Sequence, residues 1–139
     1  MNIIFENFPK LFKAALITIE LTLISLIIGI FIGLFFAILR LSKNKLLFNI
    51  SYYYSFIFRG TPLLVQIFII YFGLAQLEFI RESVFWLILK KPFACAILAF
   101  SLNTGAYTSE IFRSGFEKVD KNVIEAGNAL GLSSFYIFI

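Results

Sequence analysis

The residue types that most enzymes need for bond chemistry are scarce or missing in this chain. It contains no His, so it has no imidazole base and no His-centred triad. Asp120 is the only Asp and Cys95 the only Cys, which excludes an aspartate dyad, an internal disulfide and a Cys-x-x-Cys motif. No G-x-x-x-x-G-K-[ST] loop occurs, so the chain does not bind ATP through a P-loop. These absences predict a protein that is not an enzyme and holds no metal or cofactor.

Polar side chains do gather within two otherwise apolar stretches, where they suit binding better than bond chemistry. They are Gln66, Asn103, Thr104, Tyr107 and Glu110. Asn103 and Tyr107 are four residues apart and Glu110 lies three further on, so these three share one face of a helix. Polar groups inside a bilayer turn away from lipid, towards the interior of a helix bundle. The set predicts either a path for a polar solute or hydrogen bonds between helices, and the sequence leaves both open.

A second pattern consists of small residues that recur every four positions. Ser25, Gly29, Gly33 and Ala37 fall on one face of a helix, and Gly29-x-x-x-Gly33 is the usual form of this motif. Small side chains let two helix backbones approach closely. The favoured interpretation is packing against a helix of the same chain, and the alternative is a contact between subunits.

The composition determines which elements carry these residues. Hydrophobic residues make up 60% of the chain and charged residues 14%, and the mean hydropathy is +0.94. A soluble domain is nearer half apolar and about a quarter charged, and a chain of this length cannot bury such an excess. We therefore expect a single all-α domain that is integral to a membrane, with three transmembrane helices over about 14–39, 60–77 and 92–112.

The start of the second span has its own signals. Aromatic residues crowd the segment 49–59, which suits an elbow at the level of the lipid headgroups. Arg59 ends that elbow and Gly60 begins the second apolar run, while Thr61 suits an N-cap and Pro62 suits the first position of a new helix. Pro92 predicts a helix start for the third span in the same way.

The segment 120–139 turns hydrophilic and begins with a short predicted helix. Asp120 can cap it, and the stretch EAGNALG (125–131) contributes small and apolar positions. Gly131 suits the stop, in a backbone conformation with positive φ. A helix this short cannot span, so it predicts a surface that docks another protein or an ordinary interfacial helix.

The distribution of basic residues predicts how the chain is oriented. One side of the predicted topology holds seven Lys and Arg and the other holds five, which places the N-terminus outside and the C-terminal segment in the cytoplasm. The seven are Arg40, Lys43, Lys45, Arg59, Arg113, Lys118 and Lys121.

Two segments carry a resemblance to a known family. FRGTPLLVQIFIIYFGL (58–74) and AFSLNTGAYTSEIFRSGFEKVDKNVIEAGNALGLS (99–133) resemble the permease subunits of polar amino-acid ABC importers, the histidine, glutamine and arginine group. In that family a loop E-A-A-x-x-x-G forms a coupling helix that docks on the ATP-hydrolysing subunit. The resemblance assigns this role to Glu125, Ala126, Gly127, Leu130 and Gly131, with Gly127 in place of the usual Ala. Asp120 stands where the family commonly has Pro.

The resemblance also implies a fold, a location and partners. It implies an incomplete type I ABC importer permease fold in the bacterial inner (plasma) membrane, covering about the first three-fifths of a permease, truncated on the C-terminal side and inactive alone. The implied partners are an ABC ATPase subunit, a second permease subunit, a solute-binding protein, a polar amino acid and the lipid bilayer, but no nucleic acid. The alternatives are a small membrane interaction or assembly protein and a fragment of a secondary transporter.

Overall fold

The computed structural model describes residues 2–119 and 121–132, and within them all regular structure is helical. The helix α1 (Asn2–Arg40) begins ahead of the predicted first span and ends with the basic residue of that boundary. A short turn leads to α2 (Lys45–Gly60), and the side chain of its N-cap Asn44 accepts a hydrogen bond of 2.9 Å from the Leu46 N–H. The predicted elbow, 49–59, lies within α2.

The chain turns sharply between α2 and α3 (Leu63–Phe68), where Pro62 predicts a new helix. The two helical stretches Lys45–Gly60 and Leu63–Gln76 are bent by 107° at this break. One detail of the prediction is wrong: Thr61 closes α2 and Pro62 is the N-cap of α3. The Thr61 N–H and hydroxyl both donate to the Ile57 carbonyl, at 3.1 and 2.8 Å, so they serve the preceding helix.

The helix that follows the break changes its pitch before it ends. After α3 come a π-helical turn, η1 (Ile69–Gly73), and a 3₁₀ turn, η2 (Leu74–Gln76). Two single-turn helices, α4 (Glu78–Arg81) and α5 (Trp86–Leu89), then lead to α6 (Pro92–Glu117). Pro92 occupies the first turn of α6, as predicted. The last described helix is α7 (Lys121–Ala129).

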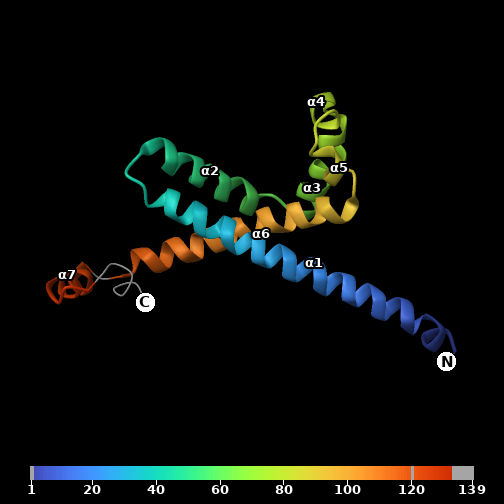
Figure 1. Ribbon diagram of the computed structural model, residues 1–139, viewed down its shortest axis with the longest axis horizontal. Helices are drawn as coiled ribbons and strands as arrows, with labels where there is room; N and C mark the ends of the chain where they lie inside the picture. The colour runs from blue at the N-terminus through green and yellow to red at the C-terminus, as the bar shows by residue number, and fades with distance from the viewer. Residues whose placement is uncertain (1, 120, 133–139) are drawn as a thin grey trace.

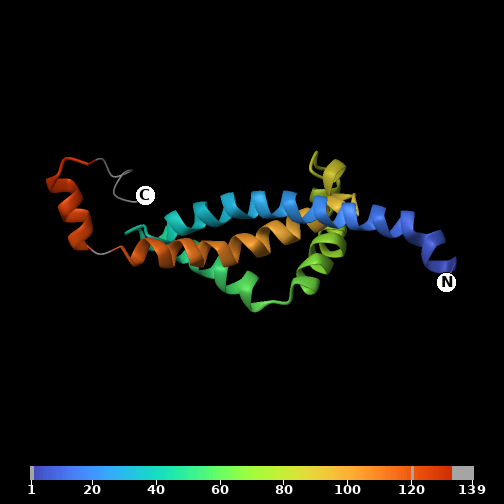
Figure 2. The ribbon, with the colours of Figure 1, turned by 90° about the horizontal axis from the view of Figure 1, so that it is seen from below.

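α1 and α6 form the core of the arrangement. They make the largest contact among the described elements: they cross in Figure 1 and run alongside each other in Figure 2, with α2 packed against both. The α3–α5 segment projects beside the start of α6. α7 lies beyond the end of α6, on the opposite side of the molecule from the N-terminus.

The described helices differ in their capacity to cross a membrane. Only α1 is long and apolar enough by itself, with mean hydropathy 2.8 over its most apolar stretch in Asn7–Arg40. α2 and Leu63–Gln76 qualify only as one bent pair. α6 has 26 residues, which is about 39 Å of helix, but its second half is rich in hydroxyl and amide side chains.

Candidate functional site

The small-residue face of α1 lies against α6 of the same chain. Ala37 is fully buried and Ser25 is 3% exposed. A Cβ added at Gly29 would come within 2.7 Å of the Thr104 Cβ, and one at Gly33 within 2.8 Å of the Thr108 Cβ. The Thr108 hydroxyl also donates to the Gly29 carbonyl at 3.2 Å. The face therefore lets two backbones approach until side chains of α6 rest on glycine.

Gln66 and Asn103, two of the five predicted path residues, meet at the break between α2 and α3. The Gln66 Nε2 donates to the Phe58 carbonyl at 2.8 Å, to the Thr61 carbonyl at 3.1 Å and to the Thr61 Oγ1 at 2.7 Å. The Asn103 Nδ2 donates to the same Phe58 carbonyl at 3.1 Å and to the Gln66 Oε1 at 3.2 Å. These bonds are the interhelical alternative that the sequence left open.

The other three path residues lie elsewhere on α6. Thr104 faces Gly29 of α1. Tyr107 is 49% exposed, and its ring lies 5.6 Å from the Arg59 guanidinium carbon. Glu110 lies one turn further towards the end of α6. The five residues are therefore divided among three neighbourhoods along α6 and its contacts.

Glu110 is the centre of a cluster of charges that the sequence did not reveal. Its carboxylate lies 2.8 Å from Arg113, 3.6 Å from Arg40 and 3.9 Å from Arg59. Arg113 also pairs with Glu117. The three arginines come from the ends of α1 and α2 and from α6 itself, so one carboxylate joins three helices. Only Arg113 could have been found from sequence, because it is three residues from Glu110.

Arg40 is the most enclosed of the three arginines. Its side chain is 12% exposed, and its guanidinium carbon lies 4.8 Å from the Phe48 ring centre and 4.6 Å from that of Tyr52. Such stacking stabilises a desolvated guanidinium. Nevertheless, its buried Nη1 has no hydrogen-bond acceptor among the described residues. The cluster thus holds more donors and more positive charge than its two carboxylates balance.

A hollow of about 560 Å³ opens beside this cluster. Its lining combines three basic side chains, one carboxylate, two hydroxyls and one apolar side chain with Gly115: Arg59, Tyr107, Glu110, Ile111, Arg113, Ser114, Gly115 and Lys118. It is the polar hollow that borders two of the predicted path residues, Tyr107 and Glu110.

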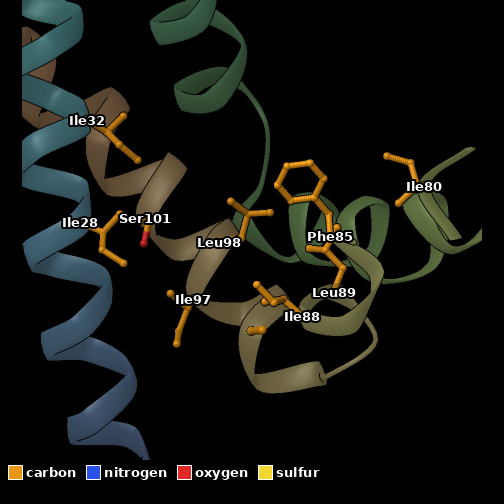
Figure 3. A pocket seen from close by; sticks show the side chains of 10 residues that line it. Ile28, Ile32, Ile80, Phe85, Ile88, Leu89, Ile97, Leu98 and Ser101 are labelled. Carbon is orange, nitrogen blue, oxygen red and sulfur yellow. The ribbon is translucent and has the colours of Figure 1, made fainter. Parts of the chain in front are cut away.

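An apolar groove of about 440 Å³ lies on another side of α6. Figure 3 shows its side chains converging from α1, α6 and the α4–α5 segment. They are Ile28, Ile32, Ile80, Phe85, Ile88, Leu89, Ala94, Ile97, Leu98 and Ser101. The Ser101 hydroxyl is buried and has no hydrogen-bond partner among the described residues. With no charge and one hydroxyl, this groove suits apolar contacts.

The predicted coupling residues lie on and just after α7. Glu125, Ala126 and Leu130 are exposed, Leu130 to 79%, whereas Gly127 is buried. Gly131 has φ of 73°, so the predicted positive-φ stop is confirmed. Asp120, the predicted cap, lies outside the described residues. Among the residues that are described, no cluster of three or more acidic, Cys or His side chains could hold a metal ion.

The chain is similar to known transport proteins over nearly all its length. Residues 29–139 match the family described as "Binding-protein-dependent transport system inner membrane component". The chain is 46% identical to the nopaline transport system permease protein NocM of Agrobacterium fabrum, over 99% of this chain and 58% of that protein. It is 41% identical to a putative glutamine transport system permease protein GlnP of Rickettsia conorii, over 94% of this chain and 57% of that one.

A solved structure agrees with these relatives. A crystal structure of an amino acid ABC transporter with histidines superposes with a TM-score of 0.75 at 31% identity, covering 96% of this chain and 58% of that one. The chain therefore spans a little more than half the length of the proteins it matches. The family match covers most of the chain, and the chain belongs to the binding-protein-dependent transport system inner membrane components.

Proposed function

We propose that this chain forms the N-terminal part of a membrane-spanning permease subunit in an ATP-driven importer of polar amino acids. The observation that carries the proposal is the match of 94–99% of the chain to permease proteins of nopaline and glutamine transport systems. The structural neighbour is also an amino acid ABC transporter. ATP hydrolysis then belongs to a partner ATPase, and a solute-binding protein and a second permease subunit complete the assembly.

The coupling role falls to α7 and the residues after it. An exposed helix beyond the end of α6, with a buried small residue and a positive-φ glycine at its end, suits docking in a groove of the ATPase. Glu125, Ala126, Gly127, Leu130 and Gly131 would make this contact. Closure of the ATPases on ATP would move α7 and, through it, the end of α6.

The solute path is proposed to follow the polar side of α6 towards the hollow beside Glu110. Support comes from the half-exposed Tyr107 ring and the excess of guanidinium groups, which suits a solute carboxylate. Gln66, Asn103 and Thr104 already make contacts within the bundle, so we propose that they support the wall of the path and do not contact the solute.

Replacement within a relative tests the proposed function directly. Residues 1–139 would replace the matching part of NocM in cells that lack their own copy, and uptake of labelled nopaline would be measured. We expect ATP-dependent uptake, because the aligned segments share 46% identity. A chimera with Gly131→Val serves as the control for coupling. If the unaltered chimera reaches the membrane in normal amounts and gives no uptake, the permease assignment is wrong.

The proposed orientation has the N-terminus outside and α7 in the cytoplasm. Reporter fusions after Lys45 and after Lys121 should both report the cytoplasm, and a fusion after Glu82 should report the outside. A cytoplasmic signal after Glu82 contradicts this topology.

A further inference from the structure

At the bend between α2 and α3, the backbone carbonyl of Phe58 receives no hydrogen bond from its own helix. In an α-helix the carbonyl of residue 58 accepts from the N–H of residue 62. Residue 62 is Pro, which has no N–H, so the Phe58 carbonyl loses its helical donor. An unpaired backbone carbonyl is costly away from water, and most of all within a membrane.

Two amide side chains provide the missing donors. Gln66 donates to the Phe58 carbonyl at 2.8 Å from α3, and Asn103 donates to it at 3.1 Å from α6. Gln66 is 5% exposed, so little water competes for these bonds. Its Oε1 accepts from Asn103 at 3.2 Å, which links the two amides to each other. The end of α2, the start of α3 and the middle of α6 therefore meet at one oxygen atom.

The residue next to this oxygen lines the charged hollow. Arg59 follows Phe58 directly, and its guanidinium reaches to 3.9 Å from the Glu110 carboxylate and over the Tyr107 ring. No hydrogen bond holds the Arg59 side chain within the described residues, so its place depends on where the last turn of α2 lies. That turn is anchored to α6 through the Phe58 carbonyl.

We propose that Gln66 and Asn103 are positioning residues. By donating to the Phe58 carbonyl they stabilise the bend between α2 and α3, and thereby keep Arg59 in the hollow beside Glu110. Pro62 and the two amides act together: Pro62 removes the helical donor to the Phe58 carbonyl, and the amide donors stabilise the bent form. Any role of this bend in solute passage rests on the proposed function. The geometry of the bend between α2 and α3 is independent of that function, and it can be tested without solute or ATPase.

The bend between α2 and the helix that follows it can be measured with two spin labels on the full chain. Leu46 on α2 and Phe72 in η1 are 67% and 54% exposed, so cysteines there accept labels, whereas the native Cys95 is 1% exposed and stays unlabelled. With a rise of ~1.5 Å per residue, the 107° bend places the two backbones about 24 Å apart, and one straight helix would place them about 39 Å apart. Pulsed electron paramagnetic resonance resolves this difference.

We expect a narrow distribution near the shorter distance in the native chain. Gln66→Met with Asn103→Leu should broaden it towards longer distances, because the bent form then loses both of the amide donors to the Phe58 carbonyl that favour it. Adding Pro62→Ala restores a helical donor and should move the distribution further towards the longer distance. The matched control is Gln76→Met, which replaces an exposed glutamine of η2 and should change nothing.

A thermal unfolding cycle separates positioning from general packing. Gln66→Met should lower the unfolding temperature clearly in the native background. The same substitution should lower the unfolding temperature much less in a Pro62→Ala background, because the alanine N–H then donates to the Phe58 carbonyl. If the double variant of Gln66 and Asn103 does not fold, Gln66→Met alone carries the distance measurement. An unchanged narrow distribution, or an equal loss of stability with and without Pro62→Ala, overturns the proposal.

Discussion

α6 meets its neighbours in two different ways on its two sides. Towards α1 it packs side chains onto glycine, with Thr104 over Gly29 and Thr108 over Gly33. Towards α2, α3 and the last residue of α1 it uses hydrogen bonds and charges, through Asn103 and Glu110. The first contact depends mainly on the absence of side-chain atoms at two glycines, and the second on the pairing of particular polar atoms.

The difference explains how the two sides should respond to change. A close-packed contact between backbones cannot absorb an added carbon, because both partners are rigid. A polar contact tolerates changes in volume better, but it loses free energy when a donor or acceptor is left unpaired. The predictions below compare these two costs on one helix, from the largest to the smallest.

The largest effect should come from added volume on the α1 side. Gly33→Val places a Cβ that overlaps the Thr108 hydroxyl and lies 3.1 Å from the Gly105 carbonyl, so α1 and α6 must separate. We expect a loss of about 3 kcal/mol in the free energy of unfolding, measured in detergent micelles. Gly60→Ala is the control, because a Cβ there meets nothing within 4 Å. Equal losses in the two variants would show that the close contact does not stabilise the bundle.

A smaller loss should follow removal of charge on the polar side. Glu110→Gln keeps the volume but leaves Arg40, 12% exposed, without a carboxylate. We expect a loss of about 2 kcal/mol, because Arg40 loses its ion-pair partner and the Arg113 Nε loses a charged hydrogen-bond acceptor. Glu117→Gln is the control: that side chain is 53% exposed, and its loss should be under about 0.5 kcal/mol. A neutral effect of Glu110→Gln would mean that solvent already screens the cluster.

A single neutral hydrogen bond on the polar side should contribute less again. The Tyr54 hydroxyl donates to the Leu102 carbonyl at 2.7 Å, and its ring stacks on Phe36 with centres 3.8 Å apart. Tyr54→Phe keeps the ring and removes the donor, so we expect a loss of about 1 kcal/mol. Tyr53→Phe, on an exposed side chain, provides the comparison. A loss as large as that of Gly33→Val would reverse the order proposed for the two sides.

The smallest effect on the bundle should come from a change outside both contacts. Gly131 has positive φ and no atom within 4 Å of an added Cβ, so Gly131→Val strains only the turn after α7. The free energy of unfolding of the bundle should change by less than about 0.5 kcal/mol. In the NocM chimera the same substitution should lower uptake relative to ATP hydrolysis. Normal uptake by that variant would remove the reason for assigning coupling to this turn.

Local patterns in the sequence were sufficient for several features of this protein. The small residues from Ser25 to Ala37 follow the helical repeat, so their common face could be predicted without knowing its partner. Pro62 and Pro92 lack an N–H, and Gly131 tolerates positive φ, so helix boundaries near them follow from the covalent structure of single residues. The membrane class follows from composition alone.

The tertiary structure decided which polar groups meet. Gln66 and Asn103 are 37 residues apart, and the carbonyl that they share belongs to Phe58, whose side chain gives no hint of this role. Arg40 and Glu110 likewise come together only because α1 and α6 pack side by side. A helical repeat shows which face a side chain occupies, but its partner depends on how distant helices cross, and no local pattern encodes that crossing.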